Sequence, residues 1–141
     1  MVNVAILGAG HIARKMADTI RQMKCRGDKV ELYAVASRSL EKAEAFAKEE
    51  SAVRAYGSYE EVAADPAVDL VYIATPHSHH AENMELCLNH GKPVLSEKAF
   101  TANAAQAERV LKLAQEKRLL AAEAIWTRYM PIRAMVDEAI A

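Results

Sequence analysis

Short apolar runs alternate along the chain with longer stretches in which apolar residues recur every three or four positions. These runs predict strands at Val2–Leu7, Val30–Ala36, Leu70–Thr75, Val94–Ser96 and Leu119–Ala122. They are largely hydrophobic rather than alternating, as expected of strands that are buried on both faces of a parallel sheet. A weaker run at 52–56 is interrupted by Arg54 and suits an edge strand. The alternation predicts an α/β fold, a doubly wound parallel sheet of the Rossmann type.

The stretches between the apolar runs have the periodicity of amphipathic helices. Ile12, Met16 and Ile20 form one apolar stripe, and a second stripe runs from Ala107 to Ala114. Two of the expected helices have capping signals at their starts. Ser58 with Glu61 has the spacing of a capping box, and Asn103 with Gln106 has a looser version of it.

Composition and charge narrow the class of protein. The 141 residues are 52% hydrophobic and 26% charged, as in an ordinary soluble globular domain. The net charge of −1 and the interleaved acids and bases argue against nucleic acid as a partner. Cys25 and Cys87 lack metal-ligand spacing and are typical of reduced thiols in a cytoplasmic protein. We expect no membrane partner either, because no apolar run approaches the roughly 18 residues of a span.

A glycine-rich turn, Gly8–Ala13, follows the first predicted strand and opens the first predicted helix. Its G-x-G-x-x-A pattern is a permitted form of the dinucleotide fingerprint. Gly8 allows the tight turn, Gly10 lets a pyrophosphate approach the helix N-terminus, and Ala13 lets the helix lie close to the strand. The cofactor-binding residues predicted from this turn are Gly8, Gly10, His11, Ile12 and Ala13. A glycine turn without a ligand is the alternative, and the position between a strand and a helix disfavours it.

The end of the second predicted strand indicates which dinucleotide binds. Sites that prefer NAD place an acidic residue there to hold the ribose 2′-hydroxyl. In this chain the strand ends in Ser37 and Arg38, a hydroxyl and a guanidinium that could bind a 2′-phosphate. The sequence therefore favours NADP as the cofactor, with NAD as the second choice. In the alternative interpretation, Arg38 stacks on adenine or faces water.

Three further strand ends carry polar groups at the edge where ligands of such sheets collect. They are the segments 74–80, 96–99 and 123–129. The first contains His77, His79 and His80, which look like metal ligands. No carboxylate or cysteine lies beside them at ligand spacing, so we expect no metal site.

The motifs together resemble the Gfo/Idh/MocA oxidoreductase family. The turn Gly8–Ala13, Thr75-Pro76 with His80, Glu97-Lys98 and the run 123–131 carry the resemblance. The last run and Ala55–Glu61 are similar to the branch of dimeric dihydrodiol dehydrogenase and xylose dehydrogenase. The resemblance covers essentially the whole chain.

The resemblance implies roles for the residues at the later strand ends. Lys98 would be catalytic, lying near the reacting carbon and transferring a proton or polarising the substrate oxygen. Glu97 would contact the nicotinamide-side ribose. The remaining implied residues are Thr75, Pro76 and His80 along the dinucleotide groove, and Trp126 and Arg128 in the walls of the cofactor and substrate site. Ala99 departs from the family's usual proline. A structural ion pair between Lys98 and Glu97 is the alternative to catalysis.

The implied function is that of the N-terminal domain of an NAD(P)-dependent dehydrogenase. It would transfer hydride to or from a small carbohydrate-like substrate, namely a sugar, a polyol or a dihydrodiol-like compound. A nucleotide-sensing Rossmann domain without catalysis is the alternative. The resemblance also implies a homo-oligomeric full-length protein.

The last stretch carries an amphipathic helix. Pro131 suits a first helical turn, and the apolar stripe that follows consists of Ile132, Met135, Val136, Ala139 and Ile140. Such a helix could close this domain's own sheet, or it could begin a connection to a C-terminal α/β substrate domain that is absent from the chain. We expect the second arrangement. Residues 1–125 would then form the dinucleotide-binding domain and residues 126–141 the start of the connection, and the chain alone would be inactive.

Overall fold

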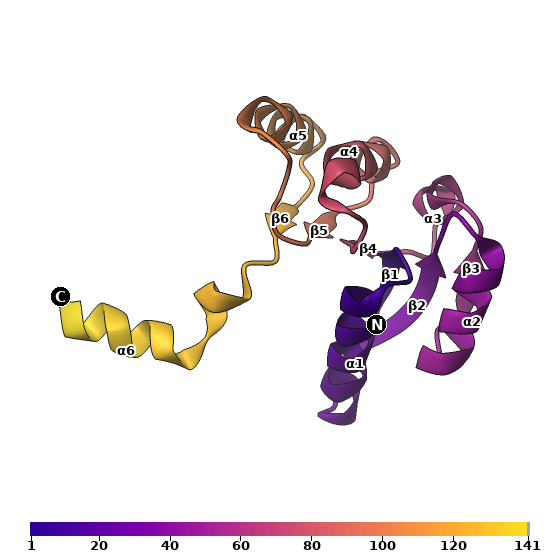
Figure 1. Ribbon diagram of the computed structural model, residues 1–141, viewed down its shortest axis with the longest axis horizontal. Coiled ribbons are helices and arrows are strands. Elements are labelled where there is room, and N and C mark those ends of the chain that lie inside the picture. The colour runs from indigo at the N-terminus through magenta and orange to yellow at the C-terminus, as the bar shows by residue number, and fades with distance from the viewer. Residues whose placement is uncertain (141) are drawn as a thin grey trace.

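The predicted apolar runs all contribute strands to one six-stranded sheet in the computed structural model, which describes residues 1–140 (Figure 1). The strands are β1 (Val2–Leu7), β2 (Val30–Ala36), β3 (Arg54–Tyr56), β4 (Leu70–Ile73), β5 (Val94–Ser96) and β6 (Ala121–Glu123). The helices are α1 (His11–Cys25), α2 (Leu40–Glu50), α3 (Tyr59–Ala64), α4 (His80–Asn89), α5 (Ala104–Lys117) and α6 (Pro131–Ile140), with 3-10 turns at His77–His79 and Trp126–Tyr129. The predicted fold class is confirmed.

Strand order defines where a ligand can bind. The order is β3-β2-β1-β4-β5-β6, and every neighbouring pair is parallel. The chain winds outward from β1 to β3 and then crosses back to place β4 on the other side of β1. At this reversal the connections leave the carboxyl ends of β1 and β4 in opposite directions, which opens a crevice at that edge of the sheet.

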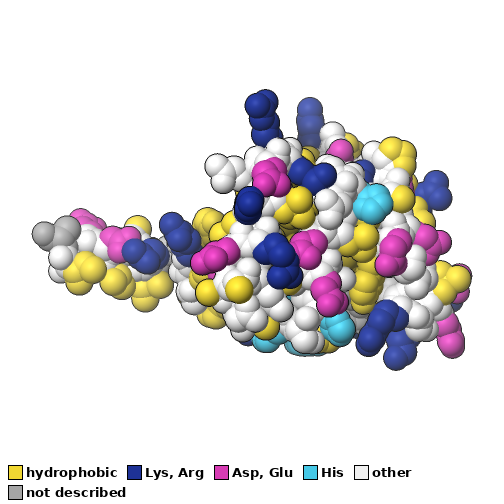
Figure 2. All heavy atoms as spheres, turned by 90° about the horizontal axis from the view of Figure 1, so that it is seen from above, with side chains coloured by type: hydrophobic (Ala, Val, Ile, Leu, Met, Phe, Trp, Pro, Cys, Tyr) yellow, Lys and Arg dark blue, Asp and Glu magenta, His cyan; other side chains and the backbone are white. Residues whose placement is uncertain are grey.

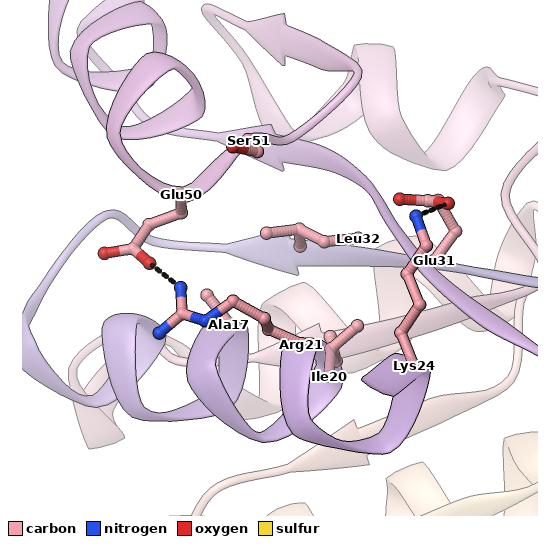
Figure 3. A pocket seen from close by; sticks show the side chains of 8 residues that line it. All are labelled: Ala17, Ile20, Arg21, Lys24, Glu31, Leu32, Glu50 and Ser51. Atoms are coloured by element: carbon pink, nitrogen blue, oxygen red, sulfur yellow. Dashed lines mark hydrogen bonds and ion pairs between the residues drawn. The ribbon is translucent and has the colours of Figure 1, made fainter. Parts of the chain in front are cut away.

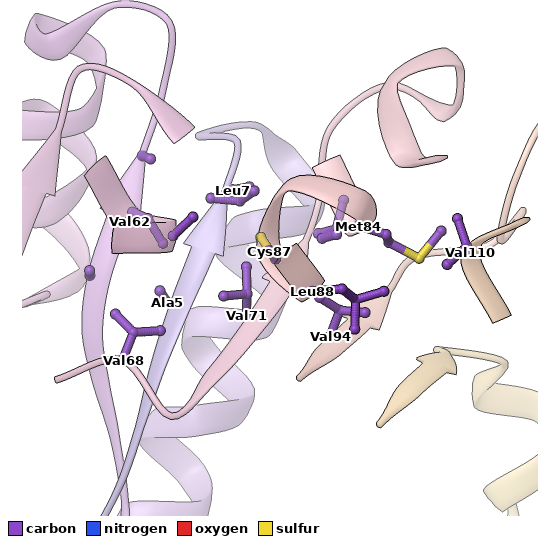
Figure 4. Close-up of a cluster of buried hydrophobic side chains, with 14 of the residues drawn as sticks. Ala5, Leu7, Val62, Val68, Val71, Met84, Cys87, Leu88, Val94 and Val110 are labelled. Carbon is purple, nitrogen blue, oxygen red and sulfur yellow. The ribbon is translucent and has the colours of Figure 1, made fainter. Parts of the chain in front are cut away.

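Two apolar cores lie on opposite faces of the sheet because successive strand residues point to opposite sides. Along β1, Ala5 and Leu7 belong to the core under α3, α4 and α5 (Figure 4). Ile6 belongs to the core under α1 and α2, where Phe46 is the largest fully buried side chain. Each fully buried large apolar side chain contributes about 1.5–3 kcal/mol, so these two layers hold the strand ends in place.

Both helices with predicted capping signals are capped by the expected residue, Ser58 at α3 and Asn103 at α5. Ser58 and Glu61 form the predicted capping box. At α5, Asn103 accepts the N–H of Gln106, whereas the Gln106 side chain accepts from Ala102 and not from the cap itself. The weak run at 52–56 forms a short edge strand, as expected.

Three predicted strands have different boundaries in the structure, and the weak run at 52–56 forms a strand only over Arg54–Tyr56. The fourth ends at Ile73 and not at Thr75, because residues 74 and 75 turn into the crevice. The last begins at Ala121 and not at Leu119. The reason is that Arg118 takes a left-handed conformation after α5 and the N–H of Leu119 closes back onto Ala114, which uses two residues in the connection.

Helix α6 projects away from the sheet (Figure 1). Its apolar residues are exposed, and Figure 2 shows apolar side chains gathered along one side of this projecting helix. The arrangement in which this helix closes the domain's own sheet is therefore not the one observed. Within residues 1–140, no helix has both the length and the apolar character needed to cross a bilayer.

Candidate functional site

The turn between β1 and α1 contains two glycines that the fold treats differently. Gly8 has a φ of +104°, and a Cβ on it would lie 2.8 Å from the carbonyl oxygen of Ala74. The fold itself therefore requires glycine at this position. Gly10 has a φ of −94°, which any residue can adopt, and a Cβ on it would meet no atom within 4 Å. Its small size leaves open space in front of the helix rather than relieving a contact.

The backbone N–H groups at the N-terminus of α1 face that space, and no side chain accepts a hydrogen bond from them. Side chains cap the starts of α2, α3 and α5, whereas no side chain caps α1 and its first turn holds no acidic residue. Free N–H groups and the positive end of the helix dipole favour an anion here. Ala13 is fully buried and brings α1 close to the sheet, as the motif predicts.

A groove runs along the carboxyl ends of β1, β2 and β4, with a hollow of about 460 Å³. It is lined by Gly8, Ala9, Gly10, His11, Ile12, Ser37, Arg38, Lys42, Tyr59, Ala74, Thr75 and Pro76. The structure thus brings together the glycine turn, the end of β2 and the Thr75-Pro76 segment, as the sequence predicts. Its lining residues come from the ends of three neighbouring strands, an arrangement that suits an extended ligand such as a dinucleotide.

The β2 end of the groove is basic. Ser37 is half-buried and its hydroxyl accepts the N–H of Ser39, while Arg38 is exposed. Lys42 in the first turn of α2 and Tyr59 at the start of α3 line the same end. Burial raises the pKa of Tyr59, and the charge of Arg38 offsets part of this rise. The guanidinium therefore lies within electrostatic range of the phenol.

Sequence reasoning missed Lys42 and Tyr59 as groove residues. A signal for Lys42 was present in the sequence. A lysine in the first turn of a helix opposes the helix dipole and is unfavourable there unless it serves another purpose. Tyr59 gives no comparable signal, because its place in the groove depends on how α3 packs beside β3.

A second hollow of about 480 Å³ adjoins the groove on the α1 side of β4, β5 and β6. It is lined by Met16, Thr19, Tyr72, Leu95, Glu97, Glu123, Ala124, Trp126 and Tyr129. Ile12 lines both the groove and an overlapping part of this hollow, so the two spaces meet at that residue. The groove therefore leads from Arg38 past the glycine turn to Glu97.

Glu97 is fixed by its neighbours at the end of β5. Its backbone N–H donates to the carbonyl of Ile73 at 3.0 Å, which continues the pairing with β4. Its carboxylate accepts a hydrogen bond from the Tyr72 hydroxyl on one oxygen and one from the N–H of Lys98, at 3.2 Å, on the other. Burial and the charge of Glu97 raise the pKa of Tyr72 well above its usual value, so its hydroxyl stays a donor.

Lys98 is exposed beside Glu97, and the peptide bond from Lys98 to Ala99 is cis. Among residues 1–140 the structure records no ion pair for the Lys98 ammonium group, and the Glu97 carboxylate is engaged elsewhere. The alternative in which Lys98 serves as the ion-pair partner of Glu97 is therefore not observed. Lys98 does not line either hollow itself, although its neighbour Glu97 lines the second one.

His80 lies beneath the groove and not in its wall. It is fully buried, with Nδ1 2.8 Å from the carbonyl oxygen of Ala99 and Nε2 2.8 Å from that of Thr75. The Thr75 hydroxyl in turn accepts a hydrogen bond from Asn83 at 2.9 Å. His80 therefore joins the loop after β4 to the loop after β5, and any effect it has on a ligand acts through those loops.

The other predicted residues fall in two groups. Trp126 is 65% exposed and lines the second hollow, whereas Arg128 is exposed and lines neither space. The rings of His77 and His80 meet edge to face, and His79 lies 3.7 Å from Glu82. Within residues 1–140, no group of three or more His, Cys, Asp or Glu side chains is arranged to hold a metal ion.

A further hollow of about 150 Å³ lies at the opposite edge of the sheet, between the ends of α1 and α2 (Figure 3). Its charged groups are paired with one another. Arg21 lies 3.5 Å from Glu50, and Lys24 lies 2.5 Å from Glu31. These pairs leave no charge directed at a ligand.

Known proteins resemble this domain in sequence. Residues 2–124 match a family described as the Gfo/Idh/MocA oxidoreductase family, NAD-binding Rossmann fold. The chain is 50% identical over 115 residues to D-xylose 1-dehydrogenase (NADP(+)) of Hypocrea jecorina, covering 79% of this chain and 29% of that protein. It is 41% identical over 126 residues to trans-1,2-dihydrobenzene-1,2-diol dehydrogenase of Bos taurus, covering 89% of this chain and 37% of that protein. The chain thus spans about a third of the length of these relatives.

Solved structures share the fold over almost all of the chain. An NAD binding oxidoreductase from Klebsiella pneumoniae has a TM-score of 0.91 at 26% identity, covering 99% of this chain and 38% of that one. A 3-ketoreductase from Actinomadura kijaniata, in complex with NADP and TDP-benzene, has a TM-score of 0.89 at 28% identity, covering 99% and 42%. The resemblance drawn from the sequence motifs, including its branch, is confirmed. The chain belongs to the Gfo/Idh/MocA oxidoreductase family, and its groove lies in that family's NAD-binding Rossmann fold.

Proposed function

We propose that this chain is the cofactor-binding part of an NADP(H)-dependent dehydrogenase that acts on a sugar, a polyol or a dihydrodiol-like compound. One observation carries the proposal. A single groove begins at a basic end beside Arg38, passes the open space in front of Gly10 and reaches Glu97 next to Lys98. That sequence of environments suits a 2′-phosphate, a pyrophosphate and a reactive ring in turn.

The residues present fit a dinucleotide carrying a 2′-phosphate. The groove lining contains no carboxylate at the β2 end, where an NAD site would place one to hold the ribose hydroxyl. Ser37, Arg38 and Lys42 would hold the phosphate, and the uncapped N–H groups behind Gly10 would hold the pyrophosphate. The names of two relatives support NADP, since the xylose dehydrogenase carries NADP(+) in its name and the ketoreductase was crystallised with NADP.

Lys98 is the residue of this chain that would donate or accept the substrate's proton. The cofactor, when bound, would supply the hydride chemistry. Reduction of a carbonyl leaves an oxygen that needs a proton, and oxidation of an alcohol releases one. The exposed ammonium group of Lys98, free of ion pairs within residues 1–140, can donate that proton or polarise the substrate oxygen.

The substrate class rests on the relatives and on the wall of the second hollow. The two relatives act, by their names, on D-xylose and on a dihydrobenzene diol, both compact molecules with neighbouring hydroxyl groups. Trp126 offers an exposed indole face, a surface that packs against the C–H groups of such rings. We further propose that residues 1–125 form the dinucleotide-binding domain, that residues 126–141 begin the connection to a substrate domain, and that the whole protein is a homo-oligomer.

Calorimetric titration with NADPH and NADH tests the proposed cofactor. We expect Arg38→Ala to weaken NADPH binding about 10- to 100-fold, because charge-assisted hydrogen bonds to phosphate are worth about 1.5–3 kcal/mol. NADH binding should change by no more than about threefold. Arg26→Ala, an exposed arginine at the far end of α1, is the matched control and should leave both affinities unchanged. Equal losses for the two cofactors would contradict the NADP preference, and binding of neither would contradict the proposal as a whole.

A second measurement separates a dehydrogenase from a nucleotide sensor. A version of the chain extended to the length of its relatives should reduce or oxidise members of a panel of sugars and dihydrodiols with NADP(H). Lys98→Met should abolish most of that turnover while retaining NADPH binding. Tight binding without turnover of any panel member would favour the sensor.

A further inference from the structure

Tyr72 is an unusual occupant of a buried strand in this sheet. It lies in β4, is only 4% exposed, and packs with the apolar core under α1 and α2. Phenylalanine would fill the same space without a polar atom to satisfy. The Tyr72 hydroxyl has one hydrogen-bond partner among residues 1–140, the carboxylate of Glu97. The hydrogen bond to that carboxylate, and not packing, therefore accounts for a tyrosine at this position.

Strand register brings the two side chains together. Tyr72 pairs with Leu95 across β4 and β5, and Glu97 lies two residues beyond Leu95. Side chains two apart on a strand point to the same face, so Tyr72 and Glu97 share the face that lines the second hollow. The phenol reaches along the strand direction toward the edge where the groove ends.

The Glu97 carboxylate is held at both oxygens. One oxygen accepts from Tyr72 and the other from the N–H of Lys98. Each carboxylate oxygen can accept two hydrogen bonds, so one acceptor position remains on each. Both donors are uncharged at neutral pH, and within residues 1–140 no cation is paired with Glu97. The result is a rigid carboxylate with two free acceptor positions at the edge of an open space, which is suited to two neighbouring hydroxyl groups.

We propose that Tyr72 is a positioning residue, and that its hydroxyl holds the Glu97 carboxylate as the acceptor for the vicinal diol of the nicotinamide-side ribose. This inference rests on the proposed function. Because Glu97 is also tied to the Lys98 backbone, the same hydrogen bond links the diol acceptor to the residue that would manage the proton. Tyr72 does not touch the ligand itself.

Two ligands that share one half test this role. NADPH contains the nicotinamide-side ribose, whereas adenosine 2′,5′-bisphosphate contains only the adenine half with its 2′-phosphate. We expect Tyr72→Phe to weaken NADPH binding about 5- to 20-fold and to change adenosine 2′,5′-bisphosphate binding by no more than about twofold, because only the first ligand reaches Glu97. The nicotinamide fluorescence of bound NADPH should also change, since it reports the surroundings of that ring.

Tyr56→Phe is the matched control. Tyr56 also donates to a carboxylate, at 2.7 Å to Asp65, but it lies on the edge strand and outside both hollows. The control should lose stability of a similar size and keep both affinities. A general loss of stability would lower the affinities of the two ligands in both variants, whereas a positioning role lowers only that of NADPH and only in Tyr72→Phe.

A double-mutant cycle with Glu97→Gln completes the test. If Tyr72 acts through Glu97, then Tyr72→Phe should weaken NADPH binding by no more than about twofold further in the Glu97→Gln background. Should Tyr72→Phe fail to fold by circular dichroism, Glu97→Gln alone must still show the selective loss of NADPH. Unchanged NADPH affinity in Tyr72→Phe, equal losses for both ligands, or additive effects in the cycle would each overturn the inference. If the unmodified chain binds neither ligand, the proposed function fails instead.

Discussion

The two glycines of the first turn allow one chemical change, glycine to alanine, to separate the fold from the binding site. At Gly10 an added Cβ meets no protein atom within 4 Å and the backbone φ of −94° suits alanine. At Gly8 the added Cβ would lie 2.8 Å from the Ala74 carbonyl oxygen, at a φ of +104°. We predict that Gly10→Ala loses ligand binding and keeps the stability of the fold. Gly8→Ala should instead lower the stability of the fold.

The size of each effect follows from this geometry. Replacing glycine by alanine at a compatible φ stabilises a protein by about 0.4–1 kcal/mol, but alanine is a poorer N-cap than glycine. Because these effects oppose each other, the free energy of unfolding of Gly10→Ala should lie within about 1 kcal/mol of that of the unmodified chain. Its methyl group, however, occupies the space through which a pyrophosphate would reach the helix. Losing two charge-assisted hydrogen bonds at about 1.5–3 kcal/mol each predicts a fall in NADPH affinity of at least about 100-fold.

Gly8→Ala has a cost within the fold. A left-handed conformation costs a residue with a side chain about 1–2 kcal/mol, and the end of β4 must also shift to clear the clash. A total of about 2–4 kcal/mol predicts a melting temperature about 10 °C lower. Thermal unfolding followed by circular dichroism and calorimetric titration with NADPH measure both quantities on both variants. Unimpaired NADPH binding by Gly10→Ala would refute the reasoning about the open space, and an unchanged melting temperature in Gly8→Ala would refute the reasoning about the turn.

Two further predictions concern ionisable groups away from the groove. Burial and the hydrogen bond to Asp65 raise the pKa of Tyr56 from 10.0 to about 12. The folded chain therefore holds that proton more tightly than the unfolded chain, and the resulting stability is fully present below about pH 10 and lost as the pH rises through about 12. Urea unfolding should show a shallower loss over this range in Tyr56→Phe, and identical slopes would contradict the assignment. Burial also raises the pKa of the Cys87 thiol to about 12. At about pH 8 an aromatic disulfide reagent should modify the exposed Cys25 and reach Cys87 only in denaturant, so rapid modification of two thiols in the native chain would count against this burial.

The order of elements and the glycine turn could be predicted from the sequence because both depend on local patterns. A largely apolar run followed by G-x-G-x-x-A specifies a buried strand, a tight turn and an open helix end within the first thirteen residues. The structure bears this out at Gly8 and Ala13, which meet the contacts that the motif requires. The last strand starts two residues later than predicted because the end of α5 takes up Leu119, whose N–H donates to the carbonyl of Ala114.

The composition of the groove walls was harder to predict because it depends on packing between distant segments. Lys42 enters the groove from the first turn of α2 and Tyr59 from α3, and neither belongs to a strand end. Tyr72 looks in sequence like one more apolar strand residue. Only the register between β4 and β5 reveals that its hydroxyl meets Glu97.

His80 shows why a polar residue at a strand end need not face the ligand. The sequence places it four residues after Pro76, at the edge where ligands collect, and the structure turns it inward at the first residue of α4. The carbonyl oxygens of two loop residues, Thr75 and Ala99, lie there, and the imidazole ring places one nitrogen 2.8 Å from each of them. The Thr75 loop lines the groove and the Ala99 loop follows Lys98, so one buried ring fixes the spacing between the binding wall and the proposed proton carrier. A residue can thus belong to a site's motif and contribute to its function through the loops that it holds apart.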